Sequence, residues 1–281
     1  MIEPASRSTL PRLQWRTCPL AQAASREPSR TPPGTVVYAI GDIHGCCDLL
    51  DTLLQGIEQD CAQRPRQRTV VVYLGDYLSR GSDSRAVVNR VMSWQPQTEG
   101  TNEIIALTGN HEELALRYLG GELEAGRHWF DHDGLDALAH YGVIAADASA
   151  RDDASMLTLR DRFAQALPQQ HLLFFQSLAV SHREQDYHFV HAGVRPGVAL
   201  SDQSAYDQIW IRKRFLESEL DHGAVVVHGH SISAEPTVRH NRIGIDTGAS
   251  ASGVLTCLVL DGTQRTFLQA VGTTVGLSNT G

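Results

Sequence analysis

The chain has 281 residues, of which 42% are hydrophobic and 20% are charged, so it has the composition of an ordinary globular protein and the length of one large α/β domain or two small ones. Its formal net charge of −8 argues against a general nucleic-acid binder, which would need a basic surface. No apolar run approaches the roughly 18 residues of a membrane-spanning helix, so neither nucleic acid nor a membrane is expected as a partner.

The N-terminal segment and the cysteines favour a cytoplasmic protein. Residues 1–34 are rich in Arg, Pro, Ser and Ala, and no continuous apolar segment follows the first residues. This composition argues against a secretory signal and favours a disordered N-terminal tail; a transit-like peptide or an over-extended start is the alternative. The five cysteines follow no metal-like spacing, so we expect reduced thiols, as in the cytoplasm.

From residue 35 onward, strand-like and helix-like segments alternate. The runs 35–42, 69–76 and 103–110 are rich in β-branched and apolar residues, and each ends in Gly followed by Asp or Asn. Helix-like segments at 46–59 and 84–94 separate them. Such alternation is typical of βαβ units, which form a parallel sheet. Because functional groups gather at the carboxyl ends of the strands in such sheets, the three Gly-Asp or Gly-Asn pairs are expected on one edge.

The second half of the chain predicts a helical insertion and then a second sheet. Residues 112–178 are mostly helix-like, and we expect them to leave the sheet as an insertion. Strand-like segments follow at 187–193, 224–230, 242–248 and 253–262. Because no regular helices separate these segments, they are expected to form a second sheet, mixed or antiparallel. The predicted fold is a four-layer α/β/β/α sandwich, formed by one domain over residues 35–281.

Polar residues that could bind a metal stand at the predicted strand ends. They are carboxylates, imidazoles and one amide: Asp42, His44, Asp76, Asn110, His111, His191, His228 and His230. This set suits a divalent transition metal better than calcium, which takes oxygen ligands, or structural zinc, which is commonly bound by cysteines. Each motif alone has an ordinary explanation as a turn, a helix N-cap or a core histidine. The eight residues belong to five short motifs, all at predicted strand ends, and together these motifs favour a metal site.

The order of these motifs resembles that of a known family. GD-x-HG at 41–45, GD-x-x-x-RG at 75–81, GNHE at 109–112, HAG at 191–193 and GH at 229–230 are similar to the motifs of the metallophosphoesterase superfamily, and specifically of its phosphoprotein phosphatase (PPP) family. The resemblance extends over about residues 35–270. The segments IWIRKRF (209–215) and RIGIDTGASASGVL (242–255) resemble the bacterial serine/threonine phosphatase-like branch.

The resemblance implies two metal ions and assigns their ligands. The first ion would be bound by Asp42, His44 and Asp76. The second would share Asp76 and would also be bound by Asn110, His191 and His230. The family's usual metals are manganese, iron or zinc, and manganese is expected first. His228 has no ligand role in the family pattern, and we expect a structural role for it.

The resemblance also implies the reaction. Hydroxide bound between the two metals would attack phosphorus directly, without a phosphoenzyme, and His111 would be the general acid for the leaving group. Arg80 and Arg212 match the phosphate-holding arginines of the family, whose planar side chains can pair with two phosphoryl oxygens. A surface position in a basic segment is the other interpretation of Arg212.

Ser79 is where the sequence departs from the family pattern. Most phosphatases of this group have an aspartate here, which hydrogen-bonds the catalytic histidine and raises its pKa. A serine can orient His111 but supplies no charge, and Asp83 is a nearby candidate to replace the carboxylate. The position is an alanine in the symmetrical diadenosine tetraphosphate hydrolases of the same superfamily. Because a nucleotide departs more easily than a serine alkoxide, Ser79 bears on the substrate as well as on the rate.

Several functions therefore remain open at this point. A serine/threonine phosphoprotein phosphatase, acting on a phosphorylated protein or peptide, is placed first because GNHE and IWIRKRF look more like that branch. The alternative is a symmetrical bis(5'-nucleosyl)-tetraphosphatase acting on a dinucleoside polyphosphate. Ser79 also motivates a third hypothesis, a catalytically weakened module that binds phosphorylated partners. A purely structural protein would bind no transition metal.

Overall fold

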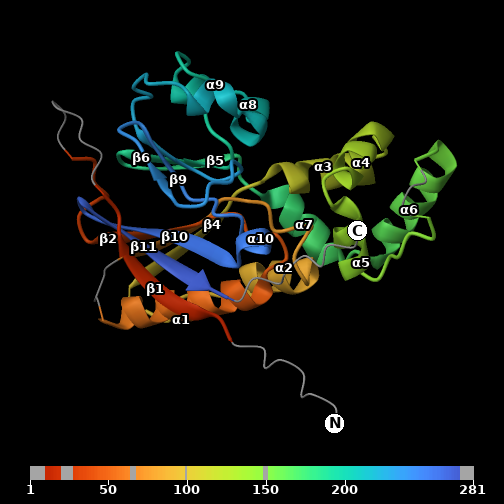
Figure 1. The fold of residues 1–281 in the computed structure, drawn as a ribbon, viewed down its shortest axis with the longest axis horizontal. Coiled ribbons are helices and arrows are strands. Elements are labelled where there is room, and N and C mark those ends of the chain that lie inside the picture. The colour runs from red at the N-terminus through yellow and green to blue at the C-terminus, as the bar shows by residue number, and fades with distance from the viewer. Residues whose placement is uncertain (1–9, 20–27, 64–67, 99, 148–150, 273–281) are drawn as a thin grey trace, which may run out of the picture.

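The chain folds into two β-sheets that pack face to face, with helices outside them (Figure 1). This computed structural model describes residues 10–19, 28–63, 68–98, 100–147 and 151–272. The layers confirm the predicted α/β/β/α class. Within the described ranges, no helix combines the length and the apolar character that crossing a membrane requires.

The parallel half of the first sheet begins the domain. Strands β2 (Thr35–Ile40), β3 (Arg68–Tyr73) and β4 (Thr101–Ala106) pair in parallel, and helices α1 (Cys47–Gln63) and α2 (Ser84–Ser93) connect them. Alternate residues of β2 contribute to two different cores, one against the helices and one against the second sheet. Burial on both faces explains why these strands are continuous apolar runs.

The other half of this sheet is antiparallel, which corrects one prediction. Strand β10 (Val254–Asp261) had been expected in the second sheet, but it pairs antiparallel with β2 and with β11 (Gln264–Val271). Leu258 and Leu260 face the second sheet, whereas Cys257 and Val259 face the helices. An apolar strand that is buried on both faces fits either sheet, so its sequence did not reveal which sheet would contain it.

The N-terminal segment also differs from the prediction. A disordered tail was expected over residues 1–34, but β1 (Arg12–Thr17) pairs antiparallel with β11 along its whole length and forms the edge of the first sheet. Leu13 packs against Gly56 of α1, where an added Cβ would lie only 2.8 Å from Leu13 Cδ2. Backbone pairing with an open strand edge needs little side-chain signal, which explains why composition missed it. Residues 1–9 and 20–27 of the predicted tail lie outside the described residues.

The second sheet is mixed. Its strand order is β5-β6-β7-β9-β8, with β6 (Tyr187–Val190), β7 (Val225–His228) and β9 (Arg242–Gly244) parallel. The short strands β5 (Ser181–Glu184) and β8 (Thr237–Val238) pair antiparallel at its two edges.

Helices cover the outer face of this sheet and lie beside both sheets. Phe215, in α9 (Lys213–Leu216), packs with Val190 and Val226 on the outer face. The preceding helices are η1 (Leu200–Asp202) and α8 (Ala205–Trp210), and α10 (Ala249–Ser252) precedes β10. The helices between the sheets in sequence are α3 (Asn110–Leu119), α4 (Leu123–Phe130), α5 (Gly134–His140), α6 (Asp153–Ala166) and α7 (Gln169–Ser177). Figure 1 shows these helices beside the sheets rather than between them.

We expect Leu13→Asp to lower the free energy of unfolding by about 1.5–3 kcal/mol, since it removes the leucine contact that joins the edge strand to α1. Gln14→Asp is the matched control, because Gln14 is exposed on the same strand. Chemical denaturation of the two variants measures the difference. If both variants unfold like the parent protein, residues 12–17 do not belong to the folded domain.

Candidate metal centre

The polar residues singled out in the sequence come together where strands of both sheets end. β2 leads to Asp42 and His44, β3 to Asp76, β4 to Asn110 and His111, β6 to His191 and β7 to His230. All of these side chains are buried. The packing of one sheet on the other therefore unites motifs that lie almost 190 residues apart, as in the 2.9 Å hydrogen bond from the backbone N–H of His230 to Asp42 Oδ2.

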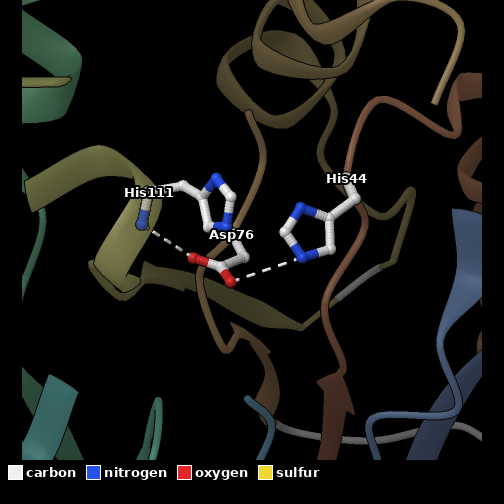
Figure 2. A group of neighbouring side chains, drawn as sticks. All are labelled: His44, Asp76 and His111. Atoms are coloured by element: carbon white, nitrogen blue, oxygen red, sulfur yellow. Dashed lines mark hydrogen bonds and ion pairs between the residues drawn. The ribbon is translucent and has the colours of Figure 1, made fainter. Parts of the chain in front are cut away.

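Asp76 lies at the middle of this group. Its Oδ2 is 3.4 Å from His44 Nε2 and 3.6 Å from His191 Nε2, and its Oδ1 accepts a 3.1 Å hydrogen bond from the backbone N–H of His111. Figure 2 shows the carboxylate between His44 and His111. The carboxylate thus faces two sets of potential ligands, one with His44 and one with His191 and His230.

The two histidines that flank Asp76 are held by backbone carbonyls. Nδ1 of His44 lies 2.9 Å from the carbonyl oxygen of Leu78, and Nδ1 of His191 lies 2.9 Å from that of Leu74. A carbonyl oxygen only accepts, so each Nδ1 carries the proton and donates it. Each Nε2 is then unprotonated and directs its lone pair at the cluster, as a metal-binding imidazole requires.

His191 also connects the cluster to its remaining members. Its Nε2 is 3.1 Å from Asn110 Oδ1 and 3.2 Å from His230 Nδ1. His228, for which no ligand role was expected, has its Nδ1 3.0 Å from the carbonyl oxygen of Gly229. A Cβ at Gly229 would collide with Asp42 Oδ1, so only glycine allows this close approach.

The backbone around the cluster adopts left-handed conformations that residues other than glycine rarely adopt. His44, Asp76, Ser79, Arg80 and His230 all have positive φ, between 46° and 71°. Such conformations cost free energy, persist only where the surroundings enforce them, and concentrate at functional sites. One such restraint is Glu112, whose carboxylate accepts hydrogen bonds from the backbone N–H groups of Asp76, Tyr77, Leu78 and Gly109 at 2.8–3.1 Å.

The electrostatics of the cluster fit bound cations. Burial raises the pKa of Asp76 to about 7, and burial together with the charge of Asp76 raises that of Glu112 to about 7. Burial, with the charges of Asp246 and Asp76, raises the pKa of Asp42 well above its usual range. On the histidine side, burial lowers the pKa of His191 to about 4. Carboxylates buried this closely repel one another and lose hydration, and bound divalent cations would offset both effects while neutral imidazoles act as their ligands.

Two buried polar atoms of the cluster are available to a metal. Asp42 Oδ1 and His230 Nε2 are among the buried side-chain atoms of the described residues that have no hydrogen-bond partner. A buried polar atom without a partner costs about 1–3 kcal/mol, so such atoms call for an ion or another ligand. Their donor types, a carboxylate oxygen and an imidazole nitrogen, suit a divalent transition metal.

His111 is bound to Ser79, and Ser79 is bound to a residue that the sequence did not single out. His111 Nδ1 lies 2.9 Å from Ser79 Oγ, and the indole Nε1–H of Trp129 donates to the same oxygen at 3.1 Å. Asp83 does not replace the missing carboxylate, because it caps α2 by accepting from Ala86 N at 2.8 Å. Trp129 comes from the helical insertion, and no sequence signal marked it.

The two arginines lie at the margin of the cluster. Arg80 Nη1 is 2.9 Å from His44 Nε2, and its Nε donates to Asp133 Oδ2 at 3.1 Å. Arg212 Nη1 donates to the carbonyl oxygen of His230 at 3.3 Å. Asp246, which the sequence motifs did not mark, is buried close enough for its charge to act on Asp42 and Asp76. It follows a strand in the segment 242–248, and the same strand-end rule would have found it.

Known proteins resemble this chain over most of its length. The family model of the calcineurin-like phosphoesterases matches residues 35–237. Bis(5'-nucleosyl)-tetraphosphatase PrpE [asymmetrical] of Anoxybacillus flavithermus is 26% identical over 78% of this chain and 88% of its own length. The symmetrical bis(5'-nucleosyl)-tetraphosphatase of Legionella pneumophila is 31% identical, but the match covers 57% of this chain and 45% of that protein.

Solved structures share the fold at low sequence identity. The crystal structure of "a putative diadenosine tetraphosphatase" superimposes with a TM-score of 0.58 at 18% identity, covering 88% of this chain and all of that one. A cold-active protein tyrosine phosphatase gives a TM-score of 0.52 at 16% identity, covering 84% and 80%. The family match over residues 35–237 and the buried donor set at the strand ends lead to the same conclusion: the chain belongs to the calcineurin-like phosphoesterases, a family of metal-dependent phosphoester hydrolases.

Proposed function

We propose that this protein hydrolyses a phosphoanhydride bond in a dinucleoside polyphosphate, with two divalent metal ions at the cluster around Asp76. The substrate class is the one that several relatives carry in their names. It reverses the order suggested by the sequence motifs, which placed phosphoprotein first. The observation that carries the proposal is the hydrogen-bonded chain from Trp129 through Ser79 to His111.

The residues around Asp76 would hold both metals. Asp42, His44 and Asp76 would bind one ion, and Asp76, Asn110, His191 and His230 would bind the other. Two divalent ions so placed supply a nucleophilic water at neutral pH and neutralise phosphoryl charge. The hydrogen bonds from His44 and His191 to backbone carbonyls keep their ligand nitrogens directed at the cluster. Glu112 keeps the loop that carries Asp76 in its strained conformation.

Trp129 determines the direction of the hydrogen bond at His111. An indole N–H is only a donor, so Ser79 Oγ accepts from it. The hydroxyl hydrogen of Ser79 is then free to point at His111 Nδ1, 2.9 Å away. If His111 Nδ1 were the donor instead, the hydroxyl hydrogen would be left without that acceptor in a buried site, which is costly. A neutral His111 therefore carries its proton on Nε2.

This arrangement bears directly on the leaving group. A carboxylate at position 79 would accept from Nδ1–H and stabilise a doubly protonated imidazole, which gives up a proton readily. Ser79 supplies no such charge, so His111 donates a hydrogen bond from Nε2 but is a weak acid. A serine or threonine alkoxide needs a proton in order to depart. A phosphate or nucleotide departs as a stable anion, for which a hydrogen bond is sufficient.

The arginines complete the recognition of phosphate. The ion pair with Asp133 holds Arg80 beside His44, and a hydrogen bond to the carbonyl of His230 holds Arg212 beside that histidine. Their planar guanidinium groups can pair with phosphoryl oxygens and stabilise the charge that develops in the transition state. A polyphosphate chain offers oxygens to both arginines.

A protein serine/threonine phosphatase is the second candidate. The motif GNHE favours it by its resemblance to that branch; in the structure the Glu112 carboxylate accepts hydrogen bonds from four backbone N–H groups. The decisive assay compares diadenosine tetraphosphate, a phosphoserine peptide and p-nitrophenyl phosphate with added Mn²⁺. We expect the dinucleotide to have the highest kcat/KM; a clear preference for the peptide would establish the second candidate instead. Absence of all turnover would favour a binding module, and Asp76→Asn is the inactive control.

Ser79→Asp tests the role assigned to the serine. It should raise kcat for an alkyl phosphate monoester by roughly 10- to 100-fold, the range of general acid catalysis, and should raise that for p-nitrophenyl phosphate much less. Ser82→Asp, an exposed position in the same loop, controls for added charge. Equal increases on both substrates would mean that His111 already donates its proton fully.

Mn²⁺ should stabilise the folded protein through the proposed ligands. At 100 times the dissociation constant, binding to the native state alone contributes about 2.7 kcal/mol, which appears as a higher melting temperature than in chelator-treated protein. Asp76→Asn should abolish most of this increase, whereas Asp131→Asn, a change at an exposed acid, should retain it. Differential scanning calorimetry with and without Mn²⁺ measures both, and an undiminished increase in Asp76→Asn would contradict the shared-ligand role.

A further inference from the structure

A group of aromatic rings extends from the side-chain cluster around Asp76 to the surface. Trp210 of α8 lies edge-on to His230, with ring centroids 6.3 Å apart. Tyr206, one helical turn earlier, stacks on Trp210 at 6.4 Å and an interplanar angle of 23°. His128 of α4 contacts Trp210 at 5.3 Å. We refer to Tyr206, Trp210 and His128 as the aromatic shelf.

The outer part of this shelf is open to solvent. Tyr206 is 68% exposed, His128 is exposed and Trp210 is half-buried. Single exposed aromatic residues are ordinary, but contiguous exposed apolar groups often mark a binding site. Here the rings contact one another, and the innermost ring, that of Trp210, contacts His230 of the cluster around Asp76. The shelf therefore continues the site already described.

The protein holds the shelf in a defined geometry. Tyr206 and Trp210 are four residues apart in α8, so they lie on the same face of the helix. Ser204 caps this helix by accepting from the backbone N–H of Asp207 at 3.0 Å. Arg195 then pairs with the Asp207 carboxylate through two hydrogen bonds of 2.9 and 3.0 Å. Figure 1 shows α8 on the outer side of the second sheet, and the His128 contact joins it to α4 of the helical insertion.

The position of the shelf defines the ligand that it suits. A ligand that occupies both places must put phosphate at the cluster around Asp76 and a flat ring against Tyr206, and a nucleotide has both groups. Stacking of a base on an aromatic side chain is worth about 1–3 kcal/mol and tolerates any base. Resting on the function proposed above, we propose that Tyr206, backed by Trp210, stacks a nucleobase of the substrate while its phosphates occupy the cluster.

Kinetics of Tyr206→Ala test this proposal. Loss of the stacking surface should raise KM for diadenosine tetraphosphate roughly 5- to 20-fold, with less than a twofold change in kcat. Hydrolysis of inorganic tripolyphosphate, which has no base, should be unchanged. Tyr206→Phe is the matched control and should behave like the parent protein, because it keeps the ring and loses only the hydroxyl group.

A binding measurement separates failure of this proposal from failure of the proposed function. Saturation-transfer NMR with AMP and metal-free protein should show transfer to the adenine protons that Tyr206→Ala removes and Tyr206→Phe preserves. An unchanged KM in Tyr206→Ala, with the dinucleotide still hydrolysed, would overturn the stacking role and leave the function intact. A parent protein that hydrolyses p-nitrophenyl phosphate but not the dinucleotide would overturn the function; AMP transfer that depends on Tyr206 would still support the base site.

Discussion

The structure depends on one electrostatic constraint, the burial of several carboxylates and histidines around Asp76. Asp42, Asp76 and Glu112 all have raised pKa values because burial removes water from them. Such a group of acids is stable only when cations or backbone N–H groups compensate it. Glu112 is compensated by backbone N–H groups, whereas Asp42 keeps an oxygen without a protein partner. The positive-φ residues and the closely approaching glycines are the consequences for the backbone.

The helical insertion adds chemistry to this cluster. Trp129 donates a hydrogen bond to Ser79, the partner of His111. Asp133 pairs with Arg80, and His128 contacts Trp210 within the aromatic shelf. All three come from α4 and the turn after it. The insertion was predicted to leave the sheet; in the structure its contacts reach Ser79 Oγ, the partner of His111, and Arg80, the arginine proposed to hold phosphate. Under the proposed function, this segment would act on substrate preference together with Tyr206 of α8.

Much of the site could be predicted from the sequence, because residues at strand ends obey a local rule. A Gly-Asp or Gly-Asn pair after a buried strand marks the carboxyl edge of a sheet, and Asp42, Asp76 and Asn110 all follow it. Trp129 could not be found in this way, since its role depends on how a distant helix packs. The predictions for β1 and β10 were wrong for a related reason. The pairing of a strand depends on which strand edges are open and on how the whole sheet packs, and short apolar patterns do not encode either. Asp246 follows the buried strand β9 and fits the same strand-end rule.

The proposed mechanism rests above all on Asp76 being shared by two divalent cations. Anomalous diffraction from crystals equilibrated with Mn²⁺ tests this sharing most directly, because it locates the ions without reference to activity. We expect two anomalous peaks, one on each side of the Asp76 carboxylate, the first beside Asp42 and His44 and the second beside Asn110, His191 and His230. A single peak, or peaks away from Asp76, would contradict the shared-ligand role.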